Sequence, residues 1–111
     1  MNKTLLVVDD DKMVAYATAR IMRSFEWDTM YVTNLATAKE MMGQVDCILT
    51  DWEPLGAAVV ASAPVPVVVF SGNPDAANRA LKGVCQVIAK PASPADLDAA
   101  LRVALSLKGA A

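Results

Sequence analysis

The chain has 111 residues, of which 55% are apolar and 20% charged, so it is long enough to bury a core and too apolar to be disordered. Its net charge of −2 provides no basic excess for holding a phosphate backbone, which argues against nucleic-acid binding. Histidine is absent, so the chain has no imidazole for acid–base catalysis, metal ligation or phosphohistidine chemistry of its own.

The first half of the chain alternates segments typical of strands and of helices. Thr4–Val8 is a continuous apolar run, which predicts a strand buried on both faces. Lys12–Phe25 follows with the apolar stripe of an amphipathic helix, and Asp28–Thr33 predicts a second strand nearer a sheet edge. A short helix is expected over Asn34–Gly43, with the asparagine as its N-cap and the glycine at its end.

The second half repeats this alternation. Its predicted elements are, in order, a strand over Val45–Thr50, a short helix over Leu55–Ala63, a strand over Val65–Phe70, a helix over Asn73–Gly83, a strand over Cys85–Ala89 and a closing helix capped by Ser93. The stretch Pro54–Pro74 carries no charge, but Pro64 and Pro66 interrupt it. We therefore expect a helix and a buried strand there rather than a transmembrane helix.

Two features favour a cytoplasmic location. The N-terminus, MNKTLLVVDD, becomes acidic too early for a signal peptide. Cys47 and Cys85 stand in apolar runs without CxxC spacing, which is typical of buried thiols in a reducing compartment.

Five strand–helix units with apolar strands predict an α/β fold over residues 1–111 as one domain. Right-handed crossovers favour a doubly wound, flavodoxin-like parallel sheet in the order 2-1-3-4-5, with a third helix that is short or missing. In such a sheet the functional site lies beyond the carboxyl ends of the strands.

Polar residues follow four of the predicted strands at that end. The first strand ends in Asp9, Asp10 and Asp11, and the others end in Asp51, Ser71 and Lys90. Each has an ordinary explanation as a helix cap, a turn residue or a solvated charge. Their coincidence at one sheet edge favours a common site.

The carboxylates of Asp9, Asp10 and Asp51 would repel one another in one pocket. Two carboxylates about 4 Å apart repel by roughly 4 kcal/mol at an effective dielectric constant of about 20. Oxygen ligands without His or Cys predict Mg²⁺, with Mn²⁺ as the alternative. Such a site could place a phosphoryl group in line with a carboxylate nucleophile, with Ser71 and Lys90 holding its oxygens.

With these motifs, the sequence resembles the response-regulator receiver domain of two-component signalling. The matching segments are LLVVDDD at the start, ILTD ending at Asp51, VVVFSG around Ser71 and VIAKPAS around Lys90. The resemblance implies that a histidine kinase or phosphotransfer protein phosphorylates Asp51, and that Ser71 and Lys90 sense the phosphoryl group. It also implies a cis peptide bond before Pro91.

The resemblance further implies the ligands of the metal. Asp10, Asp51 and the backbone carbonyl of Glu53 would bind Mg²⁺, and Asp9 would assist through a water molecule. Such a protein is an enzyme only in catalysing its own phosphorylation and dephosphorylation. We expect a stand-alone receiver that signals by contact with an unknown downstream protein.

The sequence departs from the receiver pattern in three places. Val87 stands where the family often has an aromatic residue, three positions before the lysine. Pro54 lies one residue early, and only Gly56 remains of the family's Asp-Gly pair. The segment between Asp51 and Ser71 is short, so its apolar helix either packs fully or exposes a patch for a partner or a second copy; we favour packing.

Two other functions stay open. A haloacid-dehalogenase-type phosphatase would use Asp9 and Asp11, but it needs a further acidic motif after the lysine, where only Asp96 and Asp98 follow within a predicted helix. A receiver-like adaptor that works without phosphorylation is favoured by the loss of the aromatic residue and of a normal third helix.

Overall fold

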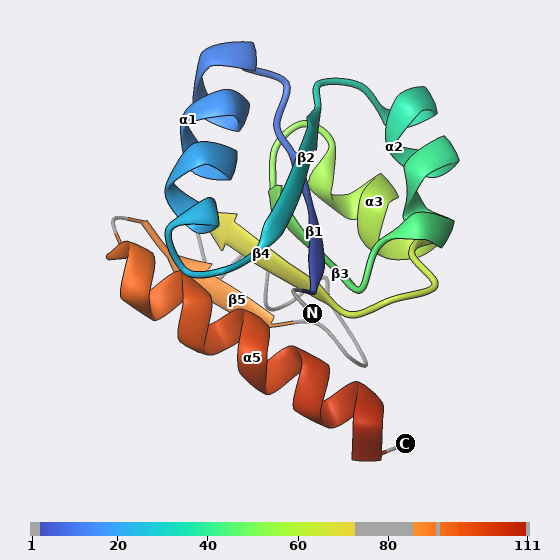
Figure 1. The fold of residues 1–111 in the computed structure, drawn as a ribbon. Helices are drawn as coiled ribbons and strands as arrows, with labels where there is room; N and C mark the ends of the chain where they lie inside the picture. Colours follow the sequence, from blue (N-terminus) through green and yellow to red (C-terminus); the bar gives the residue numbers. More distant parts are fainter. Residues whose placement is uncertain (1–2, 73–85, 91, 111) are drawn as a thin grey trace.

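A five-stranded parallel sheet forms the centre of the structure, a computed structural model that describes residues 3–72, 86–90 and 92–110 (Figure 1). The strands are β1 (Thr4–Val8), β2 (Asp28–Val32), β3 (Cys47–Asp51), β4 (Val67–Ser71) and β5 (Gln86–Ala89). Their order is β2-β1-β3-β4-β5, and each neighbouring pair is parallel. The predicted flavodoxin-like sheet is therefore confirmed.

Helices cover both faces of this sheet (Figure 1). The helices are α1 (Lys12–Arg23), α2 (Leu35–Met41), α3 (Gly56–Ser62) and α5 (Pro94–Ala110), and a 3₁₀ turn over Met42–Gln44 follows α2. α1 and α5 lie on one face, and α2 and α3 lie on the other. The helix predicted over 73–83, and Cys85, fall outside the described residues.

Successive side chains of each strand point to opposite faces of the sheet, and this divides the core into two layers. Leu5 and Val7 of β1 pack in the layer under α1 and α5, whereas Leu6 and Val8 pack in the layer under α2 and α3. All four side chains are buried. A strand buried on both faces leaves polar side chains only at its end, which is where Asp9 follows β1.

Several element boundaries differ from the predicted ones by two residues. α1 ends at Arg23 rather than Phe25, because Ser24 caps it and Glu26 takes a left-handed φ of 70° that turns the chain. β3 begins at Cys47 rather than Val45, since the Asp46 carboxylate accepts the Thr4 N–H at 2.8 Å. β3 also includes Asp51, so the strand itself positions this carboxylate.

α3 is a helix of seven residues, as the short segment between β3 and β4 predicted. Val59 is fully buried, and Ala57 and Ala61 are among its exposed positions. Among the described residues, the large apolar side chains that are exposed lie on α1 and α5: Met13, Val14, Tyr16, Ile21 and Val103. The structure thus supports a packed α3 over an exposed patch.

α5 is fastened to the turn before β2 by a polar cluster. The buried Trp27 indole N–H donates to Asp98 Oδ1 at 2.8 Å. Arg102 donates to the same oxygen at 3.3 Å and to the Phe25 carbonyl at 2.9 Å, and its guanidinium lies 4.7 Å from the Trp27 ring centroid. None of the described helices has both the length and the apolar character of a membrane span.

Candidate functional site

The three aspartates that follow β1 occupy three different environments. Asp9 is only 7% exposed, and its Oδ1 accepts the Asp11 N–H at 2.9 Å. Asp11 is the N-cap of α1, since its Oδ1 accepts the N–H groups of Met13 and Val14. Asp10 is exposed between them. Asp11 therefore has a structural role as a helix cap, and Asp9 and Asp10 are the two residues of this run that could serve the functional site.

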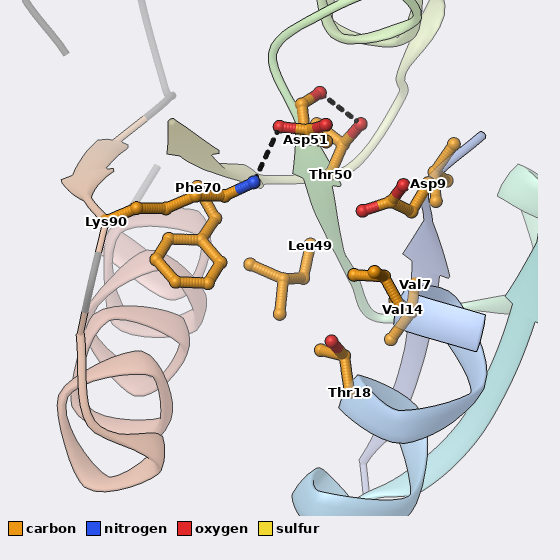
Figure 2. A pocket seen from close by; sticks show the side chains of 10 residues that line it. Val7, Asp9, Val14, Thr18, Leu49, Thr50, Asp51, Phe70 and Lys90 are labelled. Atoms are coloured by element: carbon orange, nitrogen blue, oxygen red, sulfur yellow. Dashed lines mark hydrogen bonds and ion pairs between the residues drawn. The ribbon is translucent and has the colours of Figure 1, made fainter. Parts of the chain in front are cut away.

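Asp51 ends β3, and two donors hold one of its carboxylate oxygens. Oδ1 accepts the Trp52 N–H at 2.9 Å and the Lys90 ammonium at 3.1 Å. Figure 2 shows the Lys90 side chain extending to Asp51 past Phe70, whose ring centroid lies 5.2 Å from Nζ. Both donors bind Oδ1, and neither of them contacts Oδ2.

Asp9, Asp10 and Asp51 come together at the carboxyl end of the sheet. One oxygen from each lies within 4.8 Å of the others. Each pair of ionised carboxylates at this separation repels by at least about 3 kcal/mol at an effective dielectric constant of about 20. Lys90 offsets this repulsion only in part, because it is bonded to Asp51 alone among the three.

The donor set fits a hard divalent cation. The cluster offers three carboxylates and no nitrogen or sulfur ligand, which suits Mg²⁺ and Mn²⁺ and disfavours zinc or copper. Asp10 is exposed and Asp51 is half-buried, so a cation here would keep part of its hydration shell. The residues present therefore fit the cofactor that the sequence predicted.

The pKa of Asp9 lies above its usual range, mainly because burial disfavours the charged carboxylate. The neighbouring carboxylates of Asp51 and Asp10 raise this pKa further, whereas the Asp11 N–H and the Lys90 ammonium lower it. A carboxylate that is difficult to ionise without a cation would become easier to ionise beside one.

Ser71 is the last residue of β4, and Lys90 directly follows β5 at the same end of the sheet. Ser71 is 3% exposed, and its carbonyl accepts the Lys90 N–H at 2.8 Å. This bond joins the end of β4 to the residue that follows β5. The structure thus places the Lys90 side chain against Asp51, and a backbone hydrogen bond holds Ser71 beside Lys90.

The remaining predicted site residues are placed less directly. Glu53 is exposed in the turn between β3 and α3. The Glu53–Pro54 peptide bond is cis, a feature the sequence did not predict, and Pro91, the predicted cis position, lies outside the described residues. Val87 pairs with Val69 and packs in the layer under α2 and α3.

Sequence reasoning missed two features around Asp51. A small pocket of about 40 Å³ lies below the carboxylate, and its lining includes Thr18 and Phe70 (Figure 2). Gly56 folds against β3 so closely that a Cβ there would clash with the Asp51 carbonyl and approach Trp52 Cε3 to 3.0 Å. In the sequence, Gly56 is the remainder of the family's Asp-Gly pair, but that pattern did not predict its close approach to β3.

Comparison with solved structures identifies the fold. No protein-family model and no curated protein sequence matches the chain. The N-terminal domain of a response regulator/sensory box/GGDEF three-domain protein from Carboxydothermus hydrogenoformans superposes with a TM-score of 0.81 and 24% identity, over 97% of this chain and 98% of that one. A receiver protein from Sinorhizobium medicae superposes with a TM-score of 0.80 and 22% identity, over 95% of both chains. The chain has the receiver-domain fold.

A third structure agrees with this result. A response regulator receiver domain protein from Clostridium thermocellum superposes with a TM-score of 0.79 and 19% identity, over 96% of this chain and 97% of that one. The receiver-domain fold thus persists at low sequence identity. In this chain it brings Asp9, Asp10, Asp51 and Lys90 to one end of the sheet.

Proposed function

We propose that this chain, as a single receiver domain, accepts a phosphoryl group on Asp51 from a histidine kinase or phosphotransfer protein of a cytoplasmic two-component relay. One observation carries the proposal: within the receiver-domain fold, three carboxylates converge within 4.8 Å and a lysine forms an ion pair with one of them, Asp51. Such a cluster is electrostatically unfavourable by itself and becomes favourable around a divalent cation, whose remaining positions can accept the oxygens of a phosphoryl group.

Asp9, Asp10, Asp51 and the backbone carbonyl of Glu53 are the proposed ligands of Mg²⁺, with Asp9 acting through water. When bound, the cation neutralises charge on the phosphoryl oxygens and on the carboxylates. The donor chemistry of the cluster supports this assignment, and Mn²⁺ shares it.

Asp51 Oδ2 is the proposed nucleophile, because Trp52 and Lys90 both engage Oδ1. Oδ2 attacks the phosphorus of a phosphohistidine on the donor protein, and an O–P bond forms while the P–N bond breaks. The electron pair of the broken bond stays on the donor imidazole. The product is an acyl phosphate on Asp51, formed with no net gain or loss of a proton at the carboxylate.

Phosphorylation replaces one negative charge on Asp51 with about −1.5 to −2. Lys90 already contacts this side chain, so the added charge strengthens an existing ion pair. Ser71 is joined to Lys90 through the backbone bond between β4 and β5. We propose that these two residues sense the phosphoryl group and alter the surface that a downstream protein contacts.

The phosphatase alternative is weakened by what its acidic residues do. Asp11 caps α1. Asp98 is bonded to Trp27 and Arg102, in the cluster that fastens α5 to the turn before β2. The adaptor alternative retains both of its supporting observations, which are the aliphatic Val87 at the position of the family's aromatic residue and the short helix α3.

Acetyl phosphate with Mg²⁺, followed by intact-mass measurement, tests the proposal. We expect one phosphoryl adduct on the wild type, none on Asp51→Asn, and none when EDTA removes the metal. Asp11→Asn is the matched control, because asparagine also caps helices and the adduct should persist. No adduct and no Mg²⁺ binding on the wild type would support the adaptor, and loss of the adduct in Asp11→Asn would support the phosphatase.

A further inference from the structure

A second surface with a distinct chemistry runs along the β2 edge of the sheet. Two adjoining pockets of about 100 and 300 Å³ share Tyr31 as a lining residue. Tyr16, Arg20 and Arg23 also line the first, and Lys12 lines the second. We call these two pockets the β2 groove. None of its lining residues belongs to the Asp9–Asp10–Asp51 cluster.

The β2 groove is positively charged in a protein whose net charge is −2. Its lining includes three exposed cations, Lys12, Arg20 and Arg23, and no Asp or Glu of the part of the chain that the structure describes. The ion pairs found among the described residues engage Lys90 and Arg102 instead. The lining thus has a local charge opposite in sign to the whole chain.

Helix stability explains this charge only in part. Arg20 and Arg23 lie in the last turn of α1, where a cation interacts favourably with the helix dipole. Lys12 is the first residue of the same helix, where a cation is unfavourable. The helix dipole therefore does not account for Lys12, and all three cations of α1 line the groove.

The β2 strand also offers hydrogen-bonding groups along this edge. β2 is one of the two outer strands of the sheet, and among the described residues it pairs only with β1. The Asp28 N–H and the Val32 carbonyl form hydrogen bonds on the β1 side. In a parallel strand the backbone groups of successive residues point alternately to the two sides, so the N–H and carbonyl groups of Thr29 and Tyr31 point outward. Figure 1 views this edge, with β2 in front and α1 and α2 on either side.

Two contacts hold the α1 side of the groove in place. Arg23 Nε donates to Thr29 Oγ1 at 2.8 Å, which fixes the guanidinium beside the strand and leaves its other N–H groups as donors. The rings of Tyr16 and Tyr31 pack edge to face with centroids 5.7 Å apart, and Tyr16 is half exposed. The groove therefore has an apolar wall between its cations.

We propose that the β2 groove binds an extended acidic segment of a partner protein, which adds to the sheet as a strand beside β2. The segment's backbone pairs with the outward groups of Thr29 and Tyr31. Its carboxylates meet Lys12, Arg20 and Arg23, and its apolar side chains lie on the tyrosine rings. This interaction is independent of phosphorylation at Asp51.

A synthetic peptide of alternating Glu and Val, about as long as β2, is the probe, and fluorescence anisotropy measures its binding to the full chain. We expect Arg20→Glu to weaken binding about tenfold, since it replaces an attraction by a repulsion. Lys39→Glu, the same charge change at an exposed position of α2 outside the groove, should leave affinity unchanged within about twofold. Asp51→Asn should also leave it unchanged, which separates this test from the proposed phosphorylation.

Strand pairing is tested with the same peptide carrying N-methyl groups on alternate residues. Its charge is unchanged, but it cannot donate the hydrogen bonds of a strand ladder, so we expect weaker binding. The changes in amide chemical shift that the unmethylated peptide causes at Thr29 and Tyr31 should disappear. Equal binding of the methylated peptide, or equal weakening by Arg20→Glu and Lys39→Glu, would overturn the proposal. So would equal affinity for a single-stranded oligonucleotide, which would show only a general attraction of anions.

Discussion

At the scale of single residues, the run Asp9-Asp10-Asp11 shows how identical side chains take different roles. Asp11 caps α1, Asp9 is buried at the end of β1, and Asp10 is exposed between them. The sequence predicted the cluster because the run follows an apolar strand. It could not show which carboxylate would be buried, since that depends on packing around residues distant in the chain.

Asp9→Asn should stabilise the metal-free protein at pH 7 by roughly 1 kcal/mol, the usual scale for one altered polar group. Burial raises the pKa of Asp9, and an amide oxygen can still accept the Asp11 N–H without carrying charge. Thermal unfolding in EDTA measures the difference between variant and wild type. The control is Glu40→Gln, which alters an exposed carboxylate on α2 and should have little effect.

The raised pKa of Asp9 also determines how the stability of the metal-free protein changes with pH. Folded Asp9 binds its proton at higher pH than the unfolded chain does, so its contribution makes the metal-free protein more stable as pH falls toward that pKa. This contribution is complete below the ordinary pKa of 3.8 and is lost as pH rises through the raised value. The advantage of Asp9→Asn should therefore shrink on acidification, and an advantage that grew would contradict this explanation.

Gly56→Ala should destabilise the protein by about 1–3 kcal/mol, the usual range for overpacking, and should weaken Mg²⁺ binding. The added Cβ would clash with the Asp51 carbonyl, which belongs to backbone that cannot move without shifting the site. Denaturant unfolding and metal titration measure both effects. Gly43→Ala is the matched control, since its Cβ would meet no atom within 4 Å, and equal behaviour of the two variants would refute a special role for Gly56.

At the scale of helices and strands, most of the fold could be predicted because strands buried on both faces are continuous apolar runs. β1 lies over the predicted residues, whereas β3 and β4 begin two residues later than their apolar runs do. The Asp46 side chain bonds the backbone at the start of β3, and the Pro66 carbonyl accepts the Ile48 N–H before β4 begins. Such contacts between chain segments set boundaries that a local pattern does not contain.

The cluster of Trp27, Asp98 and Arg102 could not be predicted either, since its members lie up to 75 residues apart in the chain. Asp98→Ala should destabilise the protein by about 1–3 kcal/mol, because the buried indole N–H loses its acceptor. Denaturant unfolding measures the loss. Asp96→Ala, an exposed change two residues away in α5, is expected to have a much smaller effect.

At the scale of the whole molecule, charge is distributed unevenly over the sheet. Asp9, Asp10, Asp51 and Lys90 together carry −2, which equals the net charge of the chain. The β2 groove carries positive charge and lies along the side of the sheet formed by β2, away from the carboxyl ends of β3 and β4. The sequence predicted the first cluster because parallel strands end at one edge, but it gave no signal for the second, which joins α1 to an outer strand.

Mg²⁺ should raise the unfolding temperature, because a ligand that binds only the folded state stabilises it. At a free concentration of about 100 times Kd the expected gain is about 2.7 kcal/mol. Asp51→Asn should abolish most of this gain, whereas Asp11→Asn should retain it. An identical temperature shift in both variants would show that the ion binds elsewhere.

Mapping the phosphoryl group on the chain tests the central claim most directly. After reaction with acetyl phosphate and Mg²⁺, borohydride reduces an acyl phosphate to an alcohol, so the modified aspartate becomes homoserine and is located by peptide mass spectrometry. We expect homoserine at Asp51 alone. Homoserine at Asp9, or an unmodified chain under conditions in which Mg²⁺ is bound, would contradict the assignment of Asp51 as the phosphoryl acceptor.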